Sequence, residues 1–109
     1  MKEYEFIAGA LKDGINMKET LKEAESHYKE AGYELLHSFG HNLGLEIHEE
    51  PVLASRYETK LKKNMLLTVE PGVYIPGKFG IRIEDTILVN QNGSNSLTKS
   101  GKAICVLKI

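Results

Sequence analysis

Hydrophobic positions in the first third of the chain recur with the period of an α-helix. Residues 2–12 carry apolar side chains at i, i+3, i+4 and i+7, which predicts an amphipathic helix that ends at 13–14. A second helix is predicted with Asn16 as N-cap, Glu19 at the capping-box position and Gly32 as its stop. The predicted buried faces are Tyr4, Ile7, Ala8 and Leu11 in the first helix, and Leu21, Ala24, Tyr28 and Ala31 in the second.

The remainder of the chain shows the shorter patterns that are typical of β-strands. Continuous apolar residues predict a buried strand over 65–69, and β-branched residues predict another over 81–89. Alternation over 103–109 predicts a closing strand that points Cys105 into the core. These three segments are predicted to be the main strands of a sheet.

Less regular segments connect the predicted strands. Residues 33–39 are expected to form a strand, 49–64 a loop with a helical turn near 57–61, and 90–96 a polar turn. Helices come first and strands follow, so the expected fold class is α+β with an antiparallel or mixed sheet. The length fits a single small domain over 1–109.

Composition excludes several classes of partner. The net charge is −1, and basic residues show no excess that would suggest nucleic acid as a partner. No apolar run approaches the roughly 20 residues that span a bilayer, and the N-terminus does not resemble a signal peptide. Cys105 is the only cysteine, so no intrachain disulfide can form. This pattern indicates a cytoplasmic protein without a membrane partner.

Three of the four histidines lie within twelve residues. His37, His41 and His48 are spaced by four and then seven positions, with Gly40 and Gly44 between them. Neutral imidazole is the commonest metal ligand in proteins, and it titrates near neutral pH. The cluster therefore suggests a metal or catalytic site.

The histidine cluster also has simpler interpretations. A helical zinc motif would place Glu after the first histidine, but Ser38 stands there and Gly40 weakens a helix, which disfavours a mononuclear zinc hydrolase. A glycine-rich turn followed by an ordinary strand over 45–48 explains the pattern equally well. The fourth histidine, His27, lies between the apolar and polar sides of its helix and is expected at the surface.

Carboxylates follow or interrupt the predicted strands. Glu70 ends an apolar strand and precedes Pro71, which favours an extended backbone. Strand alternation places Arg82 and Glu84 on one face and Asp85 on the other. Arg82 and Glu84 could form a pair on a solvated sheet face, or Glu84 could bind a cation, because a buried carboxylate requires one or the other.

The three motif blocks together resemble the catalytic domain of the pita-bread metallopeptidases. Residues 37–51 match H-x-x-G-H-x-x-G-L-x-x-H-E-x-P, residues 66–74 match x-E-P-G-x-Y, and residues 80–89 match G-I-R-x-E-D. The blocks occur in the family's order and are most similar to its proline-specific branch, which contains prolidase and aminopeptidase P. The resemblance implies the C-terminal half of a pita-bread fold.

The resemblance also implies a metal site. His41, Glu70 and Glu84 match metal ligands of the family, and Arg82 matches a residue that supports Glu84. The family site holds two divalent ions, for which Mn, Co or Zn would suit nitrogen and oxygen ligands. Two such ions bridge a water and polarise the scissile carbonyl.

The resemblance assigns catalytic and substrate-binding roles as well. His37 and His48 match histidines that bind substrate and stabilise the tetrahedral intermediate, and Glu70 is expected to contribute to catalysis. Tyr74 matches a residue of the substrate pocket. The implied reaction is hydrolysis of the bond before proline in short peptides.

The chain departs from the family in the number of its ligands. Two aspartate ligands come from the half of the family domain that has no counterpart here, so three ligands of five are present. Asp13 and Asp85 are the only aspartates, and neither is placed to replace the missing pair. We therefore expect weak or single-ion binding and no activity of the chain alone. A separate N-terminal half or a homodimer would be its partner, and the alternative is a non-catalytic remnant or interaction module.

Overall fold

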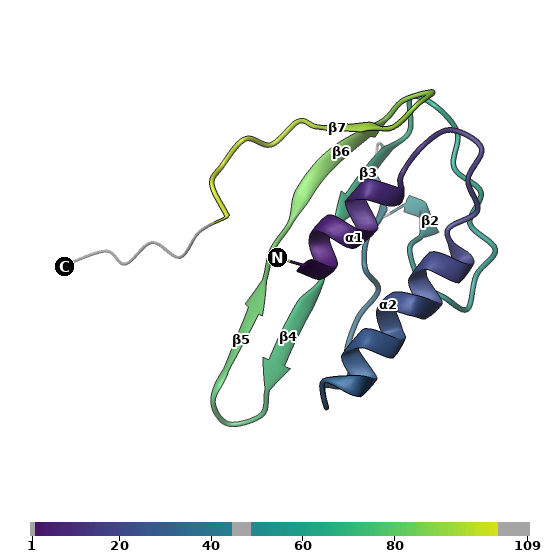
Figure 1. The fold of residues 1–109 in the computed structure, drawn as a ribbon. Coiled ribbons are helices and arrows are strands. Elements are labelled where there is room, and N and C mark those ends of the chain that lie inside the picture. The colour runs from purple at the N-terminus through teal and green to yellow at the C-terminus, as the bar shows by residue number, and fades with distance from the viewer. Residues whose placement is uncertain (1, 45–48, 103–109) are drawn as a thin grey trace.

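Two helices and seven short strands make up the computed structural model, which describes residues 2–44 and 49–102. Helix α1 spans Lys2–Ala10 and helix α2 spans Lys18–Glu30, so both predicted helices are confirmed. The two helices lie against the same face of the strands (Figure 1). Their buried side chains include Ile7 and Leu21, which belong to the predicted apolar faces.

The ends of α2 differ in detail from the prediction. Met17 is the N-cap and offers no side-chain hydrogen bond, while the backbone N–H of Lys18 donates to Oδ1 of Asn16 at 3.0 Å. Glu19 pairs with a lysine of its own helix, so the predicted capping box is wrong. Gly32 follows the last helical turn with φ of +82°, which confirms it as the stop, because glycine adopts this conformation without a steric penalty.

The strands form two antiparallel sheets. The larger has the order β2-β1-β3-β6-β7, and the smaller is the hairpin of β4 and β5. Their bounds are β1 His41–Asn42, β2 Glu49–Val52, β3 Leu66–Val69, β4 Gly72–Ile75, β5 Phe79–Arg82, β6 Asp85–Val89 and β7 Ser94–Ser96. The α+β class with antiparallel sheets is thus confirmed.

The predicted strand over 81–89 is divided between the two sheets. Strand β5 ends at Arg82 and β6 begins at Asp85. The break lies opposite Pro71, which cannot donate to a ladder because it has no backbone N–H. The hairpin β4–β5 continues the pair β3–β6 past this break, across which the backbone N–H of Ile83 donates to the carbonyl of Pro71 at 3.3 Å (Figure 1).

Other segment predictions had mixed outcomes. The strand over 33–39 is wrong, because only its last residue, Phe39, has backbone partners on both sides, Leu53 and Glu70. The helical turn near 57–61 is also wrong, and the 49–64 segment begins with β2. The polar turn over 90–96 ends in β7. Residues 45–48 and the predicted strand 103–109 with Cys105 lie outside the described residues.

The core lies between the helices and the larger sheet. Phe39 is fully buried and meets Tyr28 of α2 edge to face, with ring centroids 5.6 Å apart. The other completely buried apolar side chains come from both helices, the connecting loops and the two strands β3 and β6: Ile7, Met17, Leu21, Ala24, Leu53, Leu61, Leu67, Val69 and Val89. This core fixes the positions of β1, β3 and β6, and His41, Glu70 and Glu84 lie on or next to these strands.

Candidate functional site

Three motif residues meet where β1, β3 and β6 run side by side. His41 opens β1, Glu70 follows the last residue of β3, and Glu84 immediately precedes β6. Strand β3 pairs with both β1 and β6, so the three positions lie at neighbouring points of one sheet. Nε2 of His41 is 3.6 Å from Oε2 of Glu70, and the two side chains are only 9% and 12% exposed.

Hydrogen bonds fix the orientation of His41. Its backbone N–H donates to the hydroxyl of Thr68, and its Nδ1 lies 3.0 Å from the carbonyl oxygen of Asn42. A carbonyl only accepts hydrogen bonds, so Nδ1 carries the proton and Nε2 is directed at Glu70. This arrangement of one ring nitrogen bonded to a backbone carbonyl is the usual one for a histidine that binds metal through the other.

The two glutamates form a carboxylate pair. Burial raises the pKa of Glu84, and the charge of Glu70 and a hydrogen bond between the two carboxyl groups raise it further. The charges of Arg82 and His41 act in the opposite direction. Nη1 of Arg82 also lies 3.9 Å from Oε1 of Glu70, so the positive charge of Arg82 acts on both carboxylates.

The chemistry of these donors fits a divalent cation, but their number and arrangement do not fit the two ions of the family site. One imidazole and two carboxylates are suitable ligands for Mn, Co or Zn. Within residues 2–44 and 49–102, however, no three such side chains are arranged to hold an ion. Asp13 accepts a backbone N–H of Lys63, and Asp85 is bonded to Tyr4 and Thr98, so both aspartates lie elsewhere, as predicted.

His37 and Tyr74 form a second pair of motif residues. Nε2 of His37 lies 2.9 Å from the hydroxyl of Tyr74, and the rings meet edge to face at 5.4 Å. The structure therefore brings together two residues that the sequence assigned to substrate binding. The third, His48, lies outside the described residues.

Tyr28 contributes a contact that the sequence pattern did not reveal. It was expected only as part of the apolar face of α2, but its hydroxyl donates to the carbonyl of Gly72 at 2.8 Å. The turn that follows Glu70 is thereby tied to the helix layer. A buried tyrosine hydroxyl usually needs a hydrogen-bond partner, and this general rule was the one indication in the sequence that Tyr28 makes a polar contact.

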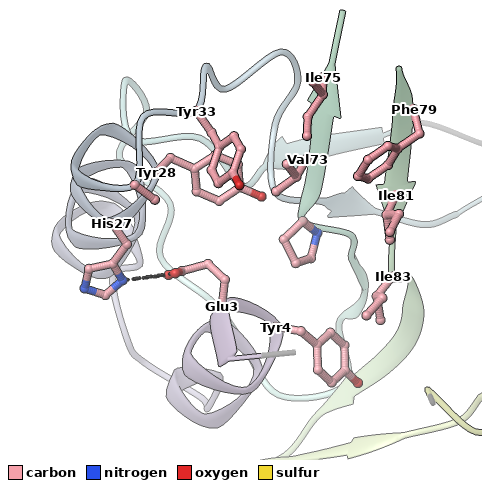
Figure 2. Close-up of a pocket in the computed structure, with 12 residues that line it drawn as sticks. Glu3, Tyr4, His27, Tyr28, Tyr33, Val73, Ile75, Phe79, Ile81 and Ile83 are labelled. Atoms are coloured by element: carbon pink, nitrogen blue, oxygen red, sulfur yellow. Dashed lines mark hydrogen bonds and ion pairs between the residues drawn. The ribbon is translucent and has the colours of Figure 1, made fainter. Parts of the chain in front are cut away.

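An apolar groove lies between the helices and the β4–β5 hairpin. Its volume is about 360 Å³, and His27 and Glu3 form an ion pair at its rim (Figure 2). The apolar side chains that line it from the hairpin and the following break are Val73, Ile75, Phe79, Ile81 and Ile83. Phe79 and Ile81 are more than half exposed, so this face is poorly covered.

Comparison with known proteins identifies relatives for most of the chain. The sequence profile of the family described as metallopeptidase family M24 matches residues 3–91. Xaa-Pro dipeptidase from Pyrococcus furiosus is 46% identical over 97 residues, which cover 87% of this chain and 28% of the relative. The chain thus spans less than a third of the length of this curated relative.

Solved structures show the same relationship. Prolidase from Pyrococcus furiosus superposes with a TM-score of 0.85 at 44% identity, covering 93% of this chain and 31% of that one. X-Pro aminopeptidase from Thermotoga maritima gives a TM-score of 0.88 at 37% identity, with 97% and 31% coverage. The fold of this chain is therefore that of one part of these larger proteins. In the described ranges no helix combines the length and apolarity needed to cross a membrane.

Proposed function

The chain belongs to metallopeptidase family M24, and on this premise we propose that it forms part of a metal-dependent peptidase that cleaves the bond before proline in short peptides. Membership of this family implies divalent metal ions. The substrate class rests on similarity to the Xaa-Pro dipeptidase and prolidase of Pyrococcus furiosus. The observation that supports this proposal most directly is the distance of 3.6 Å between Nε2 of His41 and Oε2 of Glu70.

Each motif residue has a proposed task. His41, Glu70 and Glu84 would offer one nitrogen and two carboxylates to a cation, with Arg82 holding the carboxylates in place. A bound divalent ion at such a site supplies a Lewis acid that polarises a carbonyl and activates water. Of the remaining residues, His37, His48 and Tyr74 would bind the peptide, and Glu70 is proposed to take part in proton transfer as well.

The number of donors limits what the chain can do alone. Three donors with two negative charges do not offset two divalent ions, and no further carboxylate of the described residues reaches the site. We therefore propose weak binding of a single ion and no appreciable peptidase activity without further ligands. An N-terminal segment like that of the relatives would supply them. The incomplete set of metal ligands also favours a second candidate function, that of a non-catalytic interaction module.

A peptidase assay separates the two candidates. Hydrolysis of an Xaa-Pro dipeptide with Mn²⁺ should be undetectable for the chain alone and should appear when the N-terminal part of the Pyrococcus furiosus relative is added. One preorganised group commonly contributes about 10²–10³-fold to catalysis, so the loss of two ligands should abolish turnover.

The assay has a clear control and clear contradicting results. The His41→Ala variant should fail to be complemented, whereas the exposed Glu19→Ala variant should be complemented like the native chain. Robust turnover by the chain alone would show that the donor count is wrong. Absence of turnover in every mixture would favour the interaction module.

A further inference from the structure

Two glycines of the matched motifs leave space for the side chain of Tyr74. Tyr74 lies opposite Gly80 in the β4–β5 pair, and a Cβ atom on Gly80 would come within 2.4 Å of Cδ1 of the tyrosine ring. A Cβ atom on Gly72 would come within 2.8 Å of both the Tyr74 hydroxyl and Nε2 of His37. Real Cβ atoms do not approach other atoms so closely. The ring and hydroxyl of Tyr74 therefore occupy positions that only glycine at 72 and 80 permits.

The contacts of His37 determine which of its ring nitrogens carries the proton. Nδ1 lies 2.7 Å from the carbonyl oxygen of Ser38, and Nε2 lies 2.9 Å from the hydroxyl of Tyr74. A carbonyl can only accept, so Nδ1 must be the donor. A neutral imidazole has a single N–H, so Nε2 carries a lone pair that accepts the hydroxyl proton of Tyr74.

We propose that Tyr74 is a positioning residue that holds neutral His37 as the Nδ1–H tautomer, with Nε2 unprotonated. The contact requires the tyrosine hydroxyl, and Gly72 and Gly80 provide the space for it. The hydrogen bond from Tyr28 to the carbonyl of Gly72 fixes the turn beneath this contact. The family resemblance assigned Tyr74 to the substrate pocket, whereas the geometry gives it a role through His37.

The importance of this pair for a reaction rests on the proposed peptidase function, but its geometry does not. In the neutral Nδ1–H tautomer Nε2 of His37 is an acceptor, so it cannot donate to a substrate carbonyl. To donate, the imidazole must take up a proton, and Tyr74 must then accept from Nε2 with its oxygen. Tyr74 can do so because a phenolic oxygen both donates and accepts.

Nitrogen NMR of the histidine rings tests the proposal without any activity measurement. We would label the chain with ¹⁵N-histidine and record two-bond ¹H–¹⁵N spectra at about pH 8.5, two units above the ordinary imidazole pKa. The His37→Gln variant identifies the signals of this ring by their loss. The native protein should show the Nδ1–H tautomer for His37. Observation of the Nε2–H tautomer would overturn the proposal with no variant needed.

Two variants then examine the role of Tyr74. Tyr74→Phe removes only the hydroxyl, and it should move the Nε2 resonance of His37 downfield because a hydrogen-bond donor is lost. Gly80→Ala should do the same, since its Cβ atom displaces the ring. The matched control Tyr57→Phe removes an exposed hydroxyl elsewhere and should leave the resonance unchanged. An unchanged Nε2 resonance in Tyr74→Phe would refute the positioning role.

The two proposals can fail separately. If the tautomer and the effect of Tyr74→Phe are as expected but complementation yields no peptidase, only the proposed function is lost. If peptidase activity appears while His37 is the Nε2–H tautomer, only the positioning role of Tyr74 is lost.

Discussion

At the scale of a single residue, the glycine at position 40 is required by a close contact with a strand that lies far away in the sequence. A Cβ atom at this position would lie 1.8 Å from the carbonyl oxygen of Thr68, so the backbone before β1 touches β3 directly. From the sequence, Gly40 indicated only a weak helix former. The actual reason for the glycine is a contact with a residue 28 positions later, and no local pattern could reveal it.

Substitution of glycines with different surroundings tests this interpretation. Gly40→Ala should lower the free energy of unfolding by about 3 kcal/mol or more, since strands β1 and β3 would have to separate. Gly9→Ala is the matched control, because nothing lies within 4 Å of its Cβ position in α1. It should stabilise the chain by about 0.5–1 kcal/mol. Urea unfolding of both variants provides the measurement, and equal effects would contradict the proposed close approach.

Positions of the site residues along the chain were predictable, but their contacts were not. The strand over 65–69 and the proline that follows it placed Glu70 at a strand end. The pairing of β3 with both β1 and β6 is a long-range property, so the 3.6 Å contact with His41 could not be derived from local patterns. The expected pairing of Arg82 with Glu84 alone was too simple, because Arg82 also approaches Glu70.

At the scale of elements, an ion pair joins the two helices. His27 of α2 lies 3.0 Å from the carboxylate of Glu3 in α1, and its ring meets Phe6 edge to face at 5.2 Å. The sequence predicted only a surface histidine, since the relative position of two helices depends on the sheet beneath them. Helical periodicity thus established each helix but not their contact.

This ion pair predicts a pH dependence of the helix contact. The hydrogen bond to Glu3 raises the pKa of His27, and the charges of Glu3, Glu23 and Glu30 add to this effect against a smaller opposing effect of burial. A folded-state pKa above the unfolded value means that the stabilisation is fully present below the unfolded pKa. It is lost as the pH rises through the folded value.

An NMR titration of the histidine ring protons measures the shift directly. Glu3→Gln should bring the pKa of His27 back towards its ordinary value, whereas Glu5→Gln on the same helix should leave it unchanged. A pKa of His27 that is equally high in both variants would show that Glu3 is not the cause.

The β4–β5 hairpin shows the limit of strand prediction. β-branched residues correctly indicated extended structure over 81–89, but the division between β5 and β6 lies opposite Pro71, in the segment that separates β3 from β4. An isolated two-stranded hairpin is at best marginally stable in water. The apolar face of this hairpin therefore needs support from another part of a molecule.

At the scale of the whole molecule, the groove suggests self-association of the isolated chain. Phe79 and Ile81 belong to an apolar surface, and such surfaces commonly mark interaction sites or promote aggregation. Sedimentation at high micromolar concentration should show species larger than a monomer. The side chain of Phe79 lines the groove and is 56% exposed, so Phe79→Ser should reduce the amount of these larger species.

Leu97 offers the matched control for this prediction. It is 52% exposed but does not line the groove, so Leu97→Ser should leave the sedimentation profile unchanged. A purely monomeric native chain would contradict the prediction, as would equal effects of the two substitutions.

The central claim is that His41, Glu70 and Glu84 form one cation-binding centre, and titration calorimetry with Mn²⁺ tests it most directly. Native chain should bind about one ion weakly, because the three donors are not arranged to hold an ion in this structure and Glu70 and Glu84 first have to give up their shared hydrogen bond. His41→Ala, Glu70→Ala and Glu84→Ala should each weaken binding at least tenfold, about 1.4 kcal/mol. Glu19→Ala should bind like the native chain. Native affinity in all three site variants would contradict the account.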